Sequence, residues 1–77
     1  MAAGKIEKYV AAWHPDKNSG AIVVYLKGGE KKTWGGQTAA EFLAILRILD
    51  EGDSLLTNKG WISTGKQVPG GIEDTDV

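Results

Sequence analysis

The stretch from Thr38 to Gly52 constrains the fold most, because it is the only part of the chain with the pattern of a long helix. Thr38 and Glu41 stand three residues apart, which is the spacing of a capping box. The run from Phe42 to Leu49 holds strong helix formers and neither Gly nor Pro, and Gly52 stands where a left-handed C-terminal cap is expected. The sequence therefore predicts one helix here and leaves the other residues to strands and turns.

The apolar side of this helix is unusually wide. One stripe at helical spacing consists of Phe42, Ile45, Leu46 and Leu49. Leu43 and Ile48 flank the stripe, so the apolar arc exceeds what one sheet face normally covers. The predicted solvent side consists of Glu41, Ala44, Arg47 and Glu51. We therefore expect Leu43 and Ile48 to lie in an interface with a second copy of the chain.

Three strands are predicted before the helix, over residues 6–13, 21–26 and 31–34. Residues 15–20 are polar and contain Pro, Asp, Asn, Ser and Gly, which predicts a loop. Gly28-Gly29 predicts a tight turn, and Gly35-Gly36 is expected to end the third strand. Tyr9 and Trp13 should share one face of the first strand, because their separation is even.

Two short strands are candidates after the helix, over residues 54–57 and 61–64, and they form either a hairpin or one bulged strand. Residues 69–77 are predicted to be a flexible acidic tail, which leaves residues 1–68 as one small domain. The predicted class is α+β: an antiparallel sheet of three to four strands in β-β-β-α-β order, with one helix packed on one face.

The second strand is apolar on both of its faces. Val23 and Tyr25 point away from Ile22, Val24 and Leu26, because side chains alternate along a strand. If the helix covers one face, Val23 and Tyr25 are left to water unless another surface covers them. Together with Leu43 and Ile48 they predict a homo-oligomer, whose size stays open.

Composition excludes several classes. The 77 residues include no cysteine, so neither a disulfide nor a thiolate metal site is available. The net charge of −1 argues against a generally basic nucleic-acid binder, although residues 1–32 carry six lysines against three acids. Residues 33–77 carry three basic residues against seven acidic ones, and this split could orient a partner. No apolar stretch of about 20 residues and no signal-peptide pattern occurs, so we expect a cytoplasmic protein without a membrane partner.

Residues Trp13-His14-Pro15-Asp16-Lys17-Asn18 resemble the signature of the J-domain, which implies contact with a DnaK-type chaperone through the His14-Pro15-Asp16 loop. That family places the tripeptide between two long antiparallel helices. Here only twelve residues precede Trp13, and the strand pattern of residues 21–26 follows. We therefore predict a strand-connecting loop, and an extended segment before Trp13 would exclude the J-domain arrangement.

Two further motifs are partial. Residues Gly60 to Lys66 resemble the start of a P-loop, but Gln67 stands where Ser or Thr should bind magnesium, and Pro69 follows where a helix should begin. The terminal Thr75-Asp76-Val77 resembles a class I PDZ ligand, which implies binding by strand addition. For both segments we favour a structural role over the function that the motif would imply.

No catalytic constellation is visible. His14 is the only histidine, and nothing local to it suggests a Ser-His-Asp arrangement. Asp50, Glu51 and Asp53 cluster at the helix end, where acidic side chains usually face water rather than hold a metal. We expect no enzymatic activity, no cofactor and no metal.

The sequence favours a small oligomeric module for protein interaction or structure. The alternative is a binder of single-stranded nucleic acid, because aromatic side chains beside lysines on a sheet can stack bases. The residues expected to serve it are Lys8, Tyr9, Trp13, Lys27, Lys32 and Trp34.

Overall fold

The computed structural model describes residues 4–65 and 72. The predicted tail, the end of the P-loop-like segment and the PDZ-like terminus therefore lie outside the described residues, apart from Ile72. The described chain contains the strands β1 (Gly4–His14), β2 (Ser19–Leu26), β3 (Lys31–Gln37), β4 (Leu55–Leu56) and β5 (Ile62–Ser63), and the helix α1 (Ala39–Asp50).

All strand pairs are antiparallel, and the strand order is β3-β2-β1-β4-β5. The α+β class is confirmed, with five strands where the sequence predicted three to four. The difference arises after the helix, where the hairpin alternative is the correct one. Its first strand adds to the free edge of β1 through the pairs Gly4↔Leu56 and Lys5↔Leu55.

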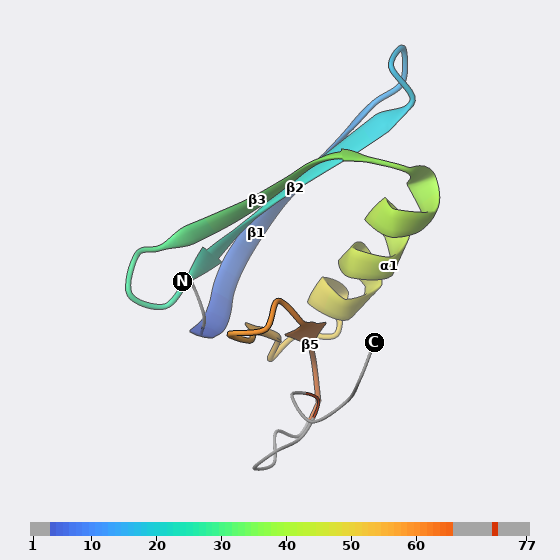
Figure 1. Ribbon diagram of the computed structural model, residues 1–77. Helices are drawn as coiled ribbons and strands as arrows, with labels where there is room; N and C mark the ends of the chain where they lie inside the picture. The colour runs from blue at the N-terminus through green and yellow to red at the C-terminus, as the bar shows by residue number, and fades with distance from the viewer. Residues whose placement is uncertain (1–3, 66–71, 73–77) are drawn as a thin grey trace.

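The β1–β2 hairpin is longer than predicted. The loop expected over residues 15–20 is a four-residue turn at 15–18, because the ladder continues through Trp13↔Gly20 and His14↔Ser19. Asn18 closes the turn with a φ of 52°, and its amide donates to the Pro15 carbonyl over 3.2 Å. The hairpin therefore projects beyond the helix, as Figure 1 shows at its upper right.

The third strand does not end at Gly35-Gly36, contrary to expectation. Between the pairs Ile22↔Trp34 and Gly20↔Gln37, β3 contains one residue more than β2. Gly36 absorbs this extra residue as a bulge with a φ of 62°, so the strand continues to Gln37.

The predicted helix caps are confirmed. The Glu41 amide donates to the Thr38 hydroxyl over 3.2 Å, and the Thr38 amide donates to Glu41 Oε1 over 2.9 Å. At the other end, the Gly52 amide donates to the Leu49 carbonyl, and Gly52 has a φ of 80°. Local sequence therefore sets both ends of α1.

Replacing Thr38 by Ala removes the side-chain acceptor of this box. We expect T38A to lower the free energy of unfolding by about 1 kcal/mol, measured by urea denaturation. The matched control is Glu41→Gln, which keeps the acceptor oxygen and should change stability by less than about 0.5 kcal/mol. Equal stability of T38A and the wild type would contradict this role of the box.

The core lies between α1 and the face of the sheet that the helix covers (Figure 1). Its buried apolar residues are Ile6, Ile22, Val24, Leu26, Leu49 and Leu56. The predicted solvent side of the helix is confirmed, since Glu41, Ala44, Arg47 and Glu51 are all exposed. Gly20 allows α1 to approach closely, because a Cβ there would lie 2.5 Å from Phe42 Cδ1.

Tyr9 joins β1 to the last turn of the helix. Its hydroxyl donates a hydrogen bond to Asp50 Oδ1. This bond, with a smaller contribution from desolvation, raises the pKa of Tyr9 above its ordinary value. Because the folded pKa is raised, the bond stabilises the fold at neutral pH, and its contribution is lost only as pH rises through the folded pKa.

Candidate functional site

One face of the β1–β2–β3 sheet has no layer over it in the described structure (Figure 1). Its residues follow from the register of the three strands and form rows that run across them. The first row is Lys8, Tyr25 and Lys31, and the second is Val10, Val23 and Thr33. The third row is Ala12 and Ala21, beside the Gly35-Gly36 bulge. We call these residues the open sheet face.

On the open sheet face, side chains become smaller from the first row, with Tyr25, to the third row, with Ala12 and Ala21. Tyr25 is half-buried, and the Lys8 Nζ lies 5.2 Å from the centroid of its ring, within the range of a cation–π contact. In the middle row Val10 is 57% exposed, which is high for a valine at the centre of a strand. Ala12 and Ala21 are exposed as well. The face is therefore apolar along its centre, and its lysines are confined to one end of β1 and β3.

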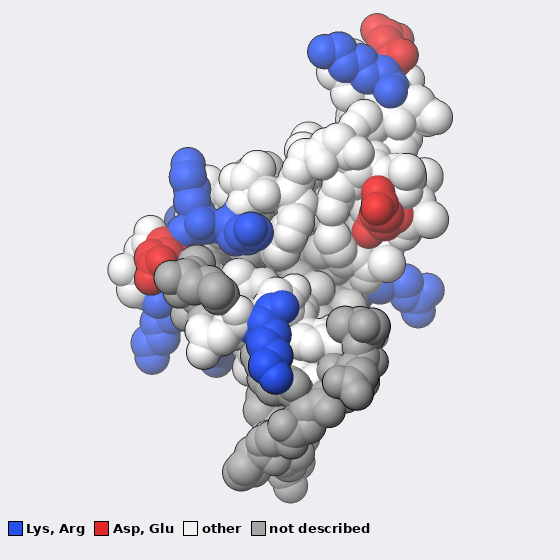
Figure 2. All heavy atoms as spheres, viewed as in Figure 1, with Lys and Arg blue, Asp and Glu red and all other residues white. Residues whose placement is uncertain are grey.

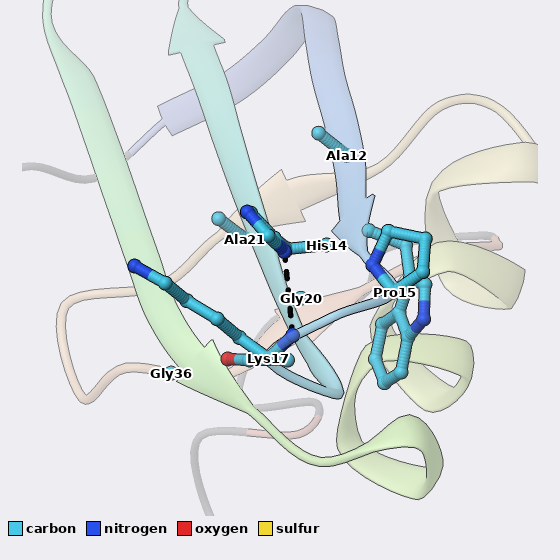
Figure 3. Close-up of a pocket in the computed structure, with 9 residues that line it drawn as sticks. Ala12, His14, Pro15, Lys17, Gly20, Ala21 and Gly36 are labelled. Carbon is cyan, nitrogen blue, oxygen red and sulfur yellow. Dashed lines mark hydrogen bonds between the residues drawn. The ribbon is translucent and has the colours of Figure 1, made fainter.

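The small residues leave a hollow of about 410 Å³ near the hairpin turn. Ala12, Ala21 and Gly36 contribute to its lining (Figure 3). His14 and Lys17 belong to its rim, where the Lys17 amide donates to His14 Nδ1 over 3.3 Å. This hollow was not predicted from the sequence. The small side chains were visible in the sequence, but their position opposite one another depends on the register between β1 and β2.

The four residues predicted for an oligomer interface fall on two surfaces. Val23 and Tyr25 lie half-buried on the open sheet face. Leu43, 56% exposed, and the half-buried Ile48 lie on the helix. Leu43 borders a separate apolar hollow of about 250 Å³ with Trp13, Ala39 and Phe42. The two surfaces are therefore distinct candidates, which mutation can separate.

The residues predicted for nucleic-acid binding do not gather on the open sheet face. Tyr9, Trp13 and Trp34 are half-buried on the side that packs against the core and helix. Lys8 lies on the open face, and Lys27 is exposed where β2 ends. Lys32 and Trp34 are brought together, because both line a groove opposite the turn that joins β4 to β5.

Packing contacts hold Tyr9, Trp13 and Trp34 on the core side of the sheet. Trp13 lies against Phe42, with ring centroids 5.6 Å apart and ring planes at 54°. Trp34 pairs across strands with the fully buried Ile22. In a domain of this size such rings supply the core volume that aliphatic residues alone would not. The sequence showed the alternation of side chains along each strand, but it did not show which of the two faces would meet the helix.

Charge is unevenly distributed over the surface. Figure 2 shows basic side chains gathered on the side of the molecule where the β2–β3 turn lies, with acidic atoms among them; this turn and its flanks carry Lys27, Glu30, Lys31 and Lys32. An ion pair joins Lys5 Nζ to Asp53 Oδ1 over 3.9 Å, and both side chains are largely exposed. A solvated pair of this kind contributes little to stability.

The described residues contain no cluster of three or more His, Asp or Glu that could hold a metal ion. No helix within the described ranges is long and apolar enough to cross a membrane. The segment before Trp13 is the strand β1, so the two helices that flank the tripeptide in a J-domain are not formed. His14-Pro15-Asp16 instead begins the turn of a β-hairpin.

Comparison with known proteins adds no relative. The chain matches no known protein family, no curated protein and no solved structure.

Proposed function

We propose that this protein is a self-associating interaction module whose two copies pack through their open sheet faces. The observation that carries the proposal is the order of the rows on that face. Large side chains (Lys8, Tyr25) and small ones (Ala12, Ala21) lie at equal distances on either side of the Val10–Val23 row. The face is thus complementary in shape to a copy of itself.

A two-fold axis that lies between the two sheets and runs along the Val10–Val23 row, perpendicular to the strands, would bring large side chains of one copy over small ones of the other. It places Tyr25 of one copy over Ala21 of the other, because both are two residues from Val23. It likewise places Lys8 over Ala12, two residues from Val10. Two sheets stack about 10 Å apart, a spacing at which a tyrosine fills the space above an alanine.

Repulsion between lysines favours the same two-fold axis. If the axis ran along the strands instead, the Lys8 and Lys31 end of one copy would face the same end of the other, and like charges would repel. With the axis across the strands, these lysines face Ala12 and the glycine bulge, and their ammonium groups can reach the solvent at the rim. The proposed dimer therefore avoids lysine–lysine contacts.

The edge strand β3 offers a weaker route to self-association. Lys31 and Lys32 place charge on it, and the bulge at Gly36 twists its end away. Charged residues and bulges are the usual devices that keep an edge strand from pairing with another chain. Face-to-face packing is therefore favoured over edge pairing.

Exchanging the large and small residues tests the size match. In Ala21→Tyr, tyrosines from both copies meet, so we expect the dimer dissociation constant to rise at least about tenfold. In the double variant Ala21→Tyr with Tyr25→Ala, the sizes are exchanged about Val23, and the constant should return to within about threefold of the wild type. Sedimentation equilibrium measures both.

The wild type should sediment at twice its 8.2 kDa chain mass. Circular dichroism of each variant checks that the sheet is retained. A chain that stays monomeric up to about 100 μM would overturn the proposal, since a specific dimer should form by then. A double variant as weak as Ala21→Tyr alone would exclude this two-fold axis.

A further inference from the structure

A groove runs between β3 and the turn that joins β4 to β5. It has a volume of about 660 Å³, within the range of sites that bind small molecules. Its lining consists of Lys32, Trp34, Leu56, Thr57, Asn58, Lys59 and Gly60. Two segments far apart in the sequence thus form one concave surface.

Neighbouring elements hold both walls in place. Lys32 and Trp34 project to the helix side of the sheet, because they pair with Val24 and Ile22, which are fully buried there. In the opposite wall, the Trp61 amide donates to the Thr57 hydroxyl over 3.0 Å, and the Gly60 amide donates to the Thr57 carbonyl. The turn is therefore a closed, hydrogen-bonded unit rather than a loose loop.

The chemistry of the lining is specific. It combines one aromatic ring and one leucine with two ammonium groups, one from each wall, and an amide. None of the described residues that line the groove is acidic, although the described ranges contain seven acidic residues. Lys32 is exposed. Such a lining fits a planar, polar ring that carries negative charge.

We propose that this groove binds a nucleobase together with the phosphates beside it, as one unit of a single strand or as a free nucleotide. The base stacks on Trp34, a contact that any base can make because every base has a π-face. Lys32 and Lys59 neutralise the phosphates from opposite sides. Asn58 supplies both a donor and an acceptor for the edge of the base.

The groove and the proposed dimer face lie on opposite sides of the sheet. The groove is lined by the residues of β3 that face the core, and the open sheet face by the alternate ones. Binding in the groove therefore does not compete with self-association. A failure of one proposal leaves the other standing.

Fluorescence anisotropy of a labelled oligothymidylate of about ten nucleotides, at about 50 mM salt, tests the site. We expect Lys32→Gln and Lys59→Gln each to weaken binding about fivefold, since each removes one phosphate contact. The matched control is Lys27→Gln, which removes the same charge from an exposed lysine outside the groove and should change binding less than about twofold. With two phosphates neutralised, log K should fall with log salt at a slope of about −1.4, and each lysine variant should reduce that slope by about 0.7.

Tryptophan emission gives the second readout. Binding should quench the wild type, and Trp34→Phe should abolish most of that quench while Trp13 and Trp61 remain. Phenylalanine is used because Trp34 also packs against the core. Thymidine monophosphate that binds as tightly as the oligonucleotide assigns the site to free nucleotides, whereas affinity that grows with length assigns it to single strands.

Three outcomes would overturn the inference. The first is no binding of either ligand at low salt. The second is an equal loss of affinity in Lys27→Gln and Lys32→Gln, because binding would then depend on overall charge and not on the groove. The third is an oligoglutamate that competes as well as the oligonucleotide, because a stacking site must prefer the base.

Discussion

Replacing Val10 by Glu should convert the protein from a dimer to a monomer. Val10 lies in the row through which the proposed two-fold axis passes, so the substitution brings two carboxylates close together in the interface. Like charges juxtaposed in an interface cost several kcal/mol, and we expect the dissociation constant to rise at least about 100-fold. Sedimentation equilibrium over a range of concentrations measures the change.

The effect should be confined to assembly. Val10 is 57% exposed, so the substitution removes few contacts within the chain, and its cost to the fold should stay below about 1 kcal/mol. Circular dichroism and urea denaturation of the monomeric variant check this. A V10E chain that has lost its sheet would be no test of the interface, and the milder Val10→Thr variant would then replace it.

Leu43→Glu is the matched control. Leu43 is 56% exposed, so the two substitutions put the same charge at equally accessible apolar positions, one on the sheet and one on the helix. We expect L43E to remain a dimer. A monomeric L43E with a dimeric V10E would move the interface to the hollow formed by Trp13, Ala39, Phe42 and Leu43. Such a result would refute the open sheet face as the interface.

Replacing Gly20 by Ala should destabilise the fold by about 1–3 kcal/mol. The added Cβ would lie 2.5 Å from Cδ1 and 2.9 Å from Cγ of Phe42, and 3.0 Å from Cε3 of Trp13. Both rings already contact each other, so neither can move aside without disturbing the other. The helix must shift away from β2, and this cost outweighs the usual gain from replacing a strand glycine.

Gly35→Ala is the control for this prediction. Gly35 is also in a strand, and its φ is not positive. Apart from its two chain neighbours, no described residue has an atom within 4 Å of the place that an added methyl group would take. We expect this variant to be neutral, or more stable by up to about 1 kcal/mol. Both substitutions are best compared by urea denaturation in the V10E background, where dissociation does not contribute. Equal stability of the two variants would show that the contact with Phe42 is not restrictive.

The helix was predictable because its signals are local. The capping box of Thr38 and Glu41 and the cap at Gly52 act within one turn, so neighbours in the sequence suffice to define them. The β1–β2 hairpin was predictable in kind for the same reason. Its turn was predicted too long, because the pairing of Ser19 and Gly20 depends on residues of β1 rather than on their own turn propensity.

The candidate surfaces were only half predictable. Alternation identified Val23 and Tyr25 as facing away from the core-forming side chains of β2, and the structure places them there. It could not reveal that Ala12 and Ala21 stand opposite one another, because that depends on the register between strands. Lys32 and Trp34 were identified as binding candidates, but their partners from the β4–β5 turn were not, because a short strand added to β1 carries no signal for that contact.

By itself the sequence determined the parts of this protein whose causes are local: one capped helix, apolar strands with two faces, and a chain without disulfides. Only the tertiary structure decided which face of each strand α1 covers, and therefore which side chains remain for function. The physical reason is that one helix can bury one face of a small sheet. Gly20 permits that contact on the side of Phe42, and the opposite face is left open.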